Sequence, residues 1–217
     1  MTKWTCMPVL GSLLMVFTPV TADAGAFEDN IIALIRKVGV HGNVGYRHPT
    51  DSNVTRGVTF GPSIGLSPGN TNGWKYPSAI TLFSEQLHNA NNGAEFGSVR
   101  TIGLMAGIGY GWHFGDLTVS PQIQIGYAFH RSTLRTDASQ ALGVVGDVAM
   151  DVSNGWMVRP EFKVEYFVAP KWTVRSSIDY VRMRPDVTVV GPAGPIGQSW
   201  DLSNVHLNFG VGFYPFR

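Results

Sequence analysis

Charged and histidine side chains occupy alternate positions in several segments of the chain, where apolar residues fill the positions between them. The candidate residues are Arg159, Glu161, Lys163, Glu165, Arg175, Asp179, His130 and His206. Because successive side chains of a β-strand point to opposite faces, residues two apart share one face. Buried charges require partners. We therefore interpret this set as the polar network inside a small barrel.

The same residues could also carry chemistry. Neighbouring Glu161 and Asp179 could act as an acid–base pair, and ion pairs that exchange partners could form a gated path or a small-ligand site. A plug of paired charges, which fills a small barrel without any chemistry, is the interpretation we favour. In this plug we expect Arg175 to pair with Glu165.

Motifs for catalysis and metal binding are weak. The six histidines lack the spacings His-x-x-x-His and His-Glu-x-x-His, and the chain has no Walker loop or Gly-x-Ser-x-Gly elbow. The run from Ser203 to His206 contains the residue types of a serine–histidine site, but only His206 points firmly inward. We therefore predict no catalytic residue, no metal, no cofactor and no enzymatic activity.

Eight segments of period-two alternation predict the strands that position these side chains. They span residues 38–46, 58–66, 76–87, 102–112, 117–129, 156–168, 172–180 and 205–213, with poor phase in the third. The polar face of these segments is rich in glycine, and aromatic residues gather near the strand ends. Only 14% of residues are charged and the net charge is +1, so no nucleic-acid partner is expected. These features favour an all-β, eight-stranded antiparallel up-and-down transmembrane barrel with its apolar face outward. A soluble lipocalin-like carrier, with the apolar face lining a cavity, is the inverted alternative.

The connections alternate in length, as they do in barrels with short periplasmic turns and long outer loops. Long loops are expected at residues 47–57, 84–98, 131–154 and 184–202. A two-residue turn at Phe114-Gly115 would pair His113 with Asp116. A three-residue turn at 169–171 would pair Val168 with Trp172, which sets Glu165 opposite Arg175 and Glu161 opposite Asp179. Arg100 is expected to face inward.

The N-terminus has the pattern of an export signal. Lys3 precedes a mostly apolar stretch from Val9 to Val20, and Ala22-Asp23-Ala24 fits a small-x-small cleavage site. We predict a signal peptide at residues 1–24 and a barrel domain at residues 25–217. Cys6 is the only cysteine of the chain, so the mature protein would contain no disulfide.

The eight alternating segments and the final strand at Val205–Phe216 resemble the small outer-membrane β-barrels of the OmpA transmembrane-domain, OmpX and OmpW kind. The resemblance implies a monomer in the bacterial outer membrane, in contact with its lipid and lipopolysaccharide. It implies a structural or surface-interaction role through the outer loops, or a narrow conduit for small apolar molecules, and as a third class a lipid A-modifying enzyme. Lipid A deacylases of similar shape carry a His-x-Ser-Asn motif, and no histidine precedes Ser203-Asn204 here in that way. No catalytic site is therefore carried over from them.

Overall fold

The computed structural model describes residues 38–66, 72–89, 92–142, 146–191 and 194–216. All of them belong to one compact unit that spans Ile35–Arg217. The expected signal peptide at residues 1–24 lies outside the described residues.

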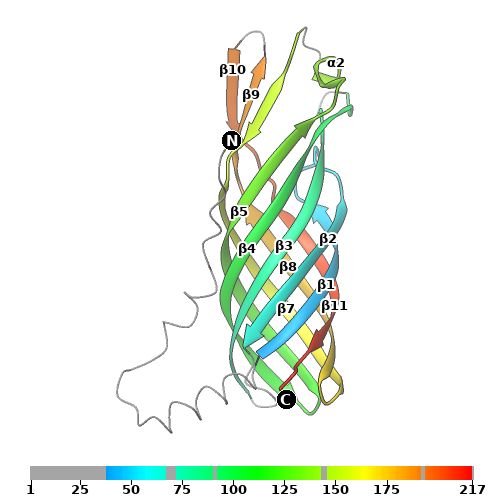
Figure 1. The fold of residues 1–217 in the computed structure, drawn as a ribbon, viewed down its shortest axis with the longest axis vertical. Coiled ribbons are helices and arrows are strands. Elements are labelled where there is room, and N and C mark those ends of the chain that lie inside the picture. The colour runs from blue at the N-terminus through cyan, green and yellow to red at the C-terminus, as the bar shows by residue number, and fades with distance from the viewer. Residues whose placement is uncertain (1–37, 67–71, 90–91, 143–145, 192–193, 217) are drawn as a thin grey trace, which may run out of the picture. The chain divides into compact units, whose positions relative to one another are not determined.

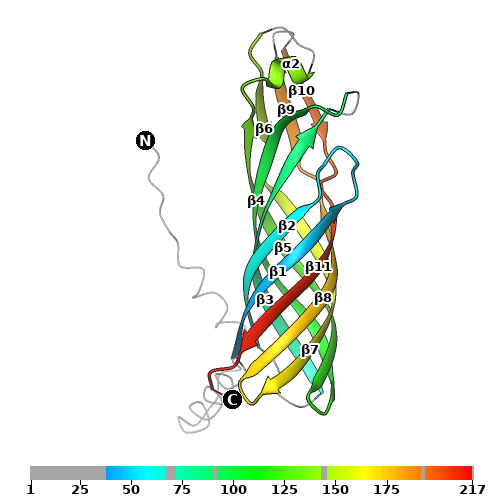
Figure 2. The same cartoon turned by 90° about the vertical axis from the view of Figure 1, so that its right-hand side faces the viewer.

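Eight antiparallel strands form a closed barrel (Figures 1 and 2). They are β1 (Val38–Pro49), β2 (Gly57–Leu66), β3 (Gly73–His88), β4 (Glu95–Phe114), β5 (Leu117–Leu134), β7 (Gly155–Ala169), β8 (Trp172–Met183) and β11 (Asn204–Phe213). Each strand pairs with the barrel strands that precede and follow it in the chain, and β1 pairs with β11 to close the ring. The predicted up-and-down barrel is confirmed, including its third strand, in which buried and exposed residues alternate despite the poor sequence phase and the register shifts only between Leu87 and His88.

Large apolar side chains cover the outside of the barrel wall. Trp156 is 73% exposed, and Phe60, Ile125 and Phe209 are also exposed. Polar residues such as Glu165 and Gln124 are instead buried in the interior. An apolar outer surface is stable against lipid and not against water. The apolar face therefore points outward, and the lipocalin-like alternative with an apolar cavity is wrong.

Two predicted loops are shorter than expected because the strands continue past the apolar band. The 84–98 connection is reduced to residues 89–94, since β3 reaches His88 and β4 starts at Glu95. Likewise β5 reaches Leu134, inside the expected 131–154 loop. Backbone pairing does not depend on the outer face being apolar, so it continues where the apolar alternation ends. In this region Arg100 is exposed, and its expected inward orientation is wrong.

The turn predictions need small corrections. Gly115 and Asp116 form the β4–β5 turn, with Gly115 at φ 66°, so His113 pairs with Thr118 instead of Asp116. A register irregularity between Phe167 and Ala169 pairs Ala169 with Trp172. The irregularity absorbs the extra residue of the expected three-residue turn, and the predicted register further up the hairpin is preserved.

A small sheet and a helix lie beyond the end of the barrel that carries the long connections (Figures 1 and 2). Strands β6 (Ala149–Val152), β9 (Asp186–Gly191) and β10 (Gly194–Ser199) pair in the order β10-β9-β6. The helix is α2 (Ala138–Leu142). The long connections at 131–154 and 184–202 therefore contain ordered secondary structure. The part of the chain that the structure describes contains no helix long and apolar enough to span a membrane.

An apolar core fills the barrel where it meets this sheet. Its fully buried members come from barrel strands, from the sheet and from the segment between β10 and β11. They include Leu87, Val99, Met157, Val181, Met183, Val187 and Leu202. Burial of such side chains contributes about 1.5–3 kcal/mol each. The core therefore holds the small sheet on the barrel and closes the lumen at this end.

Candidate functional site: the polar lumen

The polar network starts near the two-residue turns, at Glu165 on β7. Its carboxylate accepts hydrogen bonds from Thr173 (2.9 Å) and Tyr214 (3.1 Å). Lys75 Nζ lies 3.6 Å and His41 Nε2 3.5 Å from the same carboxylate. Four different segments thus converge on one buried anion, which satisfies the requirement that a buried charge be paired.

A second group surrounds Glu161 near the middle of the lumen. Gln122 and Gln124 both donate to its Oε2, and Arg159 Nη2 lies 3.8 Å from the same oxygen. Arg159 also donates to Thr81 Oγ1 (3.2 Å) and to Gln124 Oε1 (2.8 Å). These contacts distribute the positive charge of Arg159 over two acceptors besides the carboxylate. This group ties β5 and β7 to β3 across the lumen.

Arg175 corrects the expected pairing. The register places it opposite Glu165, as predicted. Its side chain, however, crosses the lumen from β8, where Nε donates to Asn43 Oδ1 and Nη2 to Ser63 Oγ (2.7 Å). The expected Arg175–Glu165 ion pair is absent from the described residues, because Glu165 is held by Lys75 and the groups around it.

Asp179 and His206 form a third group. His206 Nδ1 lies 3.1 Å from Asp179 Oδ1, and Asn208 donates to Asp179 Oδ2 (2.6 Å). Asp179 is opposite Glu161 in the register, as predicted, but separate donors bind the two carboxylates. Of the residues expected in the network, His130 lies outside these three groups. Its Nδ1 lies 3.0 Å from Thr101 Oγ1, nearer the outer end of the barrel.

Lys163 is 7% exposed and lies between Glu161 and Glu165 on the inward face of β7. Both carboxylates attract its ammonium group, but other donors already occupy them. The expected network residues are therefore all present in or near the lumen, and their partners differ from the simplest cross-strand pairs.

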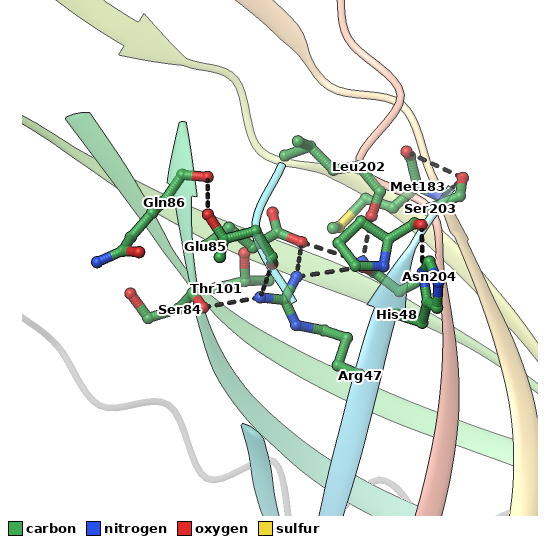
Figure 3. Close-up of polar contacts among 12 residues, drawn as sticks. Arg47, His48, Ser84, Glu85, Gln86, Thr101, Met183, Leu202, Ser203 and Asn204 are labelled. Atoms are coloured by element: carbon green, nitrogen blue, oxygen red, sulfur yellow. Dashed lines mark hydrogen bonds and ion pairs between the residues drawn. The ribbon is translucent and has the colours of Figure 1, made fainter. Parts of the chain in front are cut away.

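Sequence reasoning missed the ion pair of Arg47 and Glu85, both with 0% exposure, at the level just below the apolar core (Figure 3). Arg47 Nη1 donates to Glu85 Oε1 and to Asn204 Oδ1 (3.1 Å). Asn204 Nδ2 in turn donates a hydrogen bond to Glu85 Oε1 (3.0 Å). Arg47 fell in an expected loop, and Glu85 fell where the expected strand 76–87 and the expected loop 84–98 overlap. Counting on in steps of two from His41 would have placed Arg47 on the inward face of the first strand.

Two levels of closure follow from these contacts. Ion pairs and amides fill the lumen through the membrane-spanning part, and the apolar core fills it above Arg47. Among the described residues, the polar lumen contains a cavity of about 50 Å³, which is room for about three to five waters. Side chains therefore fill most of the lumen along the described part of the barrel.

The cavity reaches the wall between β2 and β3. Register pairs run through Thr59–Phe83 and Phe60–Leu82 and resume at Ser63–Ala79, so the pairs at positions 61–81 and 62–80 are missing. Pro62 has no backbone N–H to donate at this point. The residues around the gap line the cavity together with Lys163 and Arg175 on the opposite wall.

The residues considered for catalysis do not form a nucleophile–base pair. Ser203 Oγ accepts from Met183 N (3.2 Å) and lies 3.5 Å from Met183 O. His206 is turned to Asp179. Within the described ranges, no group of three or more metal-ligating side chains could hold a metal ion.

Comparison with known proteins identifies the fold. No protein-family model matches the chain, and no curated protein does. Among solved structures, the outer membrane protein OprG from Pseudomonas aeruginosa is similar with a TM-score of 0.70 at 12% identity, covering 81% of this chain and 94% of that one. The outer membrane protein AlkL has a TM-score of 0.52 at 13% identity and covers 81% and 88%. A major outer membrane protein from Thermus thermophilus has a TM-score of 0.50 at 10% identity and covers 81% and 98%. The chain thus has the fold of the small outer-membrane β-barrels, which supports an outer-membrane location.

Proposed function

We propose that this outer-membrane-type barrel has a structural or surface-interaction role, and that its ordered outer sheet, not its lumen, is the working part. The observation that carries this proposal is the double closure of the lumen by the ion network and the apolar core. A pore would need a continuous path, whereas the remaining cavity is about 50 Å³. The buried side chain of Val187 anchors β9 to the core, so the sheet can present a fixed surface to a partner.

The first test is conductance of the purified protein in planar bilayers. We expect no channels, and stable single-channel steps would refute the closed lumen. The second test is the attachment of protein-bearing liposomes to bacterial or host cells. Val190→Lys changes an exposed residue of β9, and we expect it to reduce attachment. The matched control Val174→Lys places the same charge on the lipid-facing wall and is judged only after a heat-dependent gel shift shows a folded barrel. Equal attachment by wild type, Val190→Lys and protein-free liposomes would refute a surface role.

A narrow conduit for small apolar molecules is the second candidate, and the interrupted ladder between β2 and β3 favours it. For this role the apolar core at the outer end would have to open, and a molecule that entered there could then leave sideways through the seam between β2 and β3. The polar residues that line the cavity disfavour passage of a small apolar molecule, and this candidate is therefore second.

A disulfide across the seam tests the conduit directly. Ser63 and Ala79 are register partners, and antiparallel partners have the Cα separation that a disulfide needs. In Ser63→Cys/Ala79→Cys liposomes, a conduit predicts that oxidation slows the entry of a small apolar solute and that reduction restores it. Equal entry rates before and after reduction would remove this candidate. Release of fatty acid from lipopolysaccharide is not expected under either proposal.

A further inference from the structure

We infer that Arg100 and Arg131 form a binding site for the phosphate of an outer-leaflet glycolipid, of the lipopolysaccharide class. The two residues are direct register partners on β4 and β5, and both are exposed on the outside of the barrel. This inference assigns a lipid ligand to two named residues of the outer-membrane barrel. It rests on the proposal that the long connections lie on the outer side of the membrane.

The position of the two arginines follows from the length of the apolar band. On β4 the outward apolar residues run from Phe114 to Ile102, and on β5 from Leu117 to Phe129. Each segment is thirteen residues long by its numbering, enough to cover the roughly 9–11 residues that a membrane-spanning strand needs. Arg100 and Arg131 are the next outward positions on the two strands. They therefore lie at the level where the headgroups of the lipid begin.

The aromatic residues set the same level independently. Tyr127 and Phe129 are exposed on β5, and Trp156 is exposed on β7 opposite Tyr127. Such aromatic residues mark the membrane–water interface in transmembrane barrels. Arg131 follows Phe129 by one outward step. The guanidinium groups are thus placed directly above the interfacial ring of aromatic side chains.

The electrostatics of the pair call for an anion. Directly opposite residues of antiparallel strands have Cβ atoms about 4.5–5.5 Å apart, and like charges at this separation are destabilising. Within the described ranges, neither guanidinium makes an ion pair or hydrogen bond to another side chain. By contrast, the exposed Arg184 has a carboxylate partner, Asp201 Oδ2 at 3.1 Å. A phosphate between Arg100 and Arg131 would turn the repulsion into two charge-assisted interactions.

Phosphate suits this site better than a carboxylate-bearing protein partner, because the site lies on the lipid-facing wall at headgroup height. Guanidinium groups present planar pairs of N–H donors that match phosphate oxygens. The lipids of the outer leaflet are the phosphates present at this level. The proposal therefore commits to the glycolipid phosphate as the occupant.

The test uses the full barrel in phosphatidylcholine nanodiscs containing a small fraction of diphosphoryl lipid A, or the same lipid A after removal of its phosphates. The variants are Arg100→Gln, Arg131→Gln and the double variant, and Arg184→Gln is the matched control with the same charge change. The lipid A retained per barrel is measured by native mass spectrometry. Each single variant is expected to lower the affinity for diphosphoryl lipid A about tenfold, the effect of one lost charge-assisted hydrogen bond. Arg184→Gln should leave it unchanged.

Unfolding in urea supplies a second readout, the effect of each substitution on the unfolding midpoint in the two lipids. If the arginines had only a structural role, this effect would not depend on the lipid. In pure phosphatidylcholine, Arg100→Gln relieves repulsion and should raise the unfolding midpoint or leave it unchanged. With diphosphoryl lipid A, the same substitution should lower the midpoint, so the sign of its effect reverses with the lipid. Both positions are exposed, and a heat-dependent gel shift confirms that each variant is folded.

Three results would overturn the inference. They are equal retention of phosphorylated and dephosphorylated lipid A by wild type, equal loss on Arg184→Gln, and an unfolding effect with the same sign in both lipids. Full competition by inorganic phosphate at the concentration of the lipid would likewise show a free-anion site instead of a lipid site. None of these results depends on conductance or attachment, so they are separable from failure of the proposed function.

Discussion

Replacing Glu85 by glutamine tests whether the Arg47–Glu85 ion pair stabilises the upper lumen. Glutamine has nearly the same volume, and its carbonyl can still accept the hydrogen bond from Asn204. The substitution therefore removes the negative charge while it disturbs packing little. Arg47 is left as a buried cation without a carboxylate at 0% exposure.

The expected cost follows from the contacts that remain. Breaking a buried ion pair from one side typically costs about 3–5 kcal/mol, because the other charge stays buried. Arg47 keeps hydrogen bonds from Nη2 to the carbonyl oxygens of Ser84 (2.9 Å) and Thr55 (3.2 Å). Its guanidinium also lies 5.4 Å from the centre of the Phe83 ring. We therefore expect the lower end of the range, about 3 kcal/mol.

Equilibrium unfolding of the barrel in urea, with lipid bilayers as the folded environment, measures this free energy. With an m-value of about 1–3 kcal/mol per molar, a loss of about 3 kcal/mol moves the midpoint down by about 1–3 M. The m-value should not change, because the surface exposed on unfolding is the same in both proteins.

A double variant separates the ion pair from the packing around it. Arg47→Met with Glu85→Met replaces both charges by apolar side chains beside Phe83 and Leu87, which belong to the apolar core. Buried ion pairs replaced in this way are often neutral or more stable, so the double variant should recover most of the loss. A Glu85→Gln midpoint equal to wild type, or a double variant less stable than Glu85→Gln, would refute the reasoning.

Three further outcomes are expected. Gly107→Ala should prevent folding, because its Cβ would overlap backbone and side-chain atoms of β5, whereas Gly42→Ala meets open space and should fold; the heat-dependent gel shift distinguishes them. Arg175→Gln removes the hydrogen bonds to Asn43 and Ser63 and should lower the free energy of unfolding by about 1–3 kcal/mol, while Glu165 keeps its own partners. Glu165→Gln should cost more, so a greater loss for Arg175→Gln in urea unfolding would contradict this prediction. Burial raises the pKa of Asp201, but hydrogen bonds from Ser203 and Arg184 lower it below 3.8 overall. Its contribution to stability is therefore present above pH 3.8 and lost as pH falls through the lower, folded pKa, which NMR titration of the Asp201 carboxylate would show.

Much of the barrel could be predicted locally, because lipid imposes a period-two pattern on any strand that crosses it. The strands from Ile102 to Trp112 and from Leu117 to Phe129 show that pattern at full length. The same pattern carried the inward placement of Glu165 and the register of Glu165 with Arg175. Above the bilayer the outer face is polar again, so the alternation disappears while backbone pairing continues. This is why Glu85 and Arg100 were misplaced.

The partners of the inward side chains were decided by the closed tertiary structure. Long side chains reach across a narrow lumen, so Arg175 binds Asn43 and Ser63 from the far wall and not the carboxylate opposite it. Lys75 and Tyr214 reach Glu165 from other segments for the same reason. Within the alternating segments, which residues share a face could be read from the chain alone, because that depends on each residue's position along a strand; Arg100 lies beyond the alternation and was assigned to the wrong face. Which inward residues meet could not be read from the pattern, since that depends on closure of the ring and on the diameter it encloses.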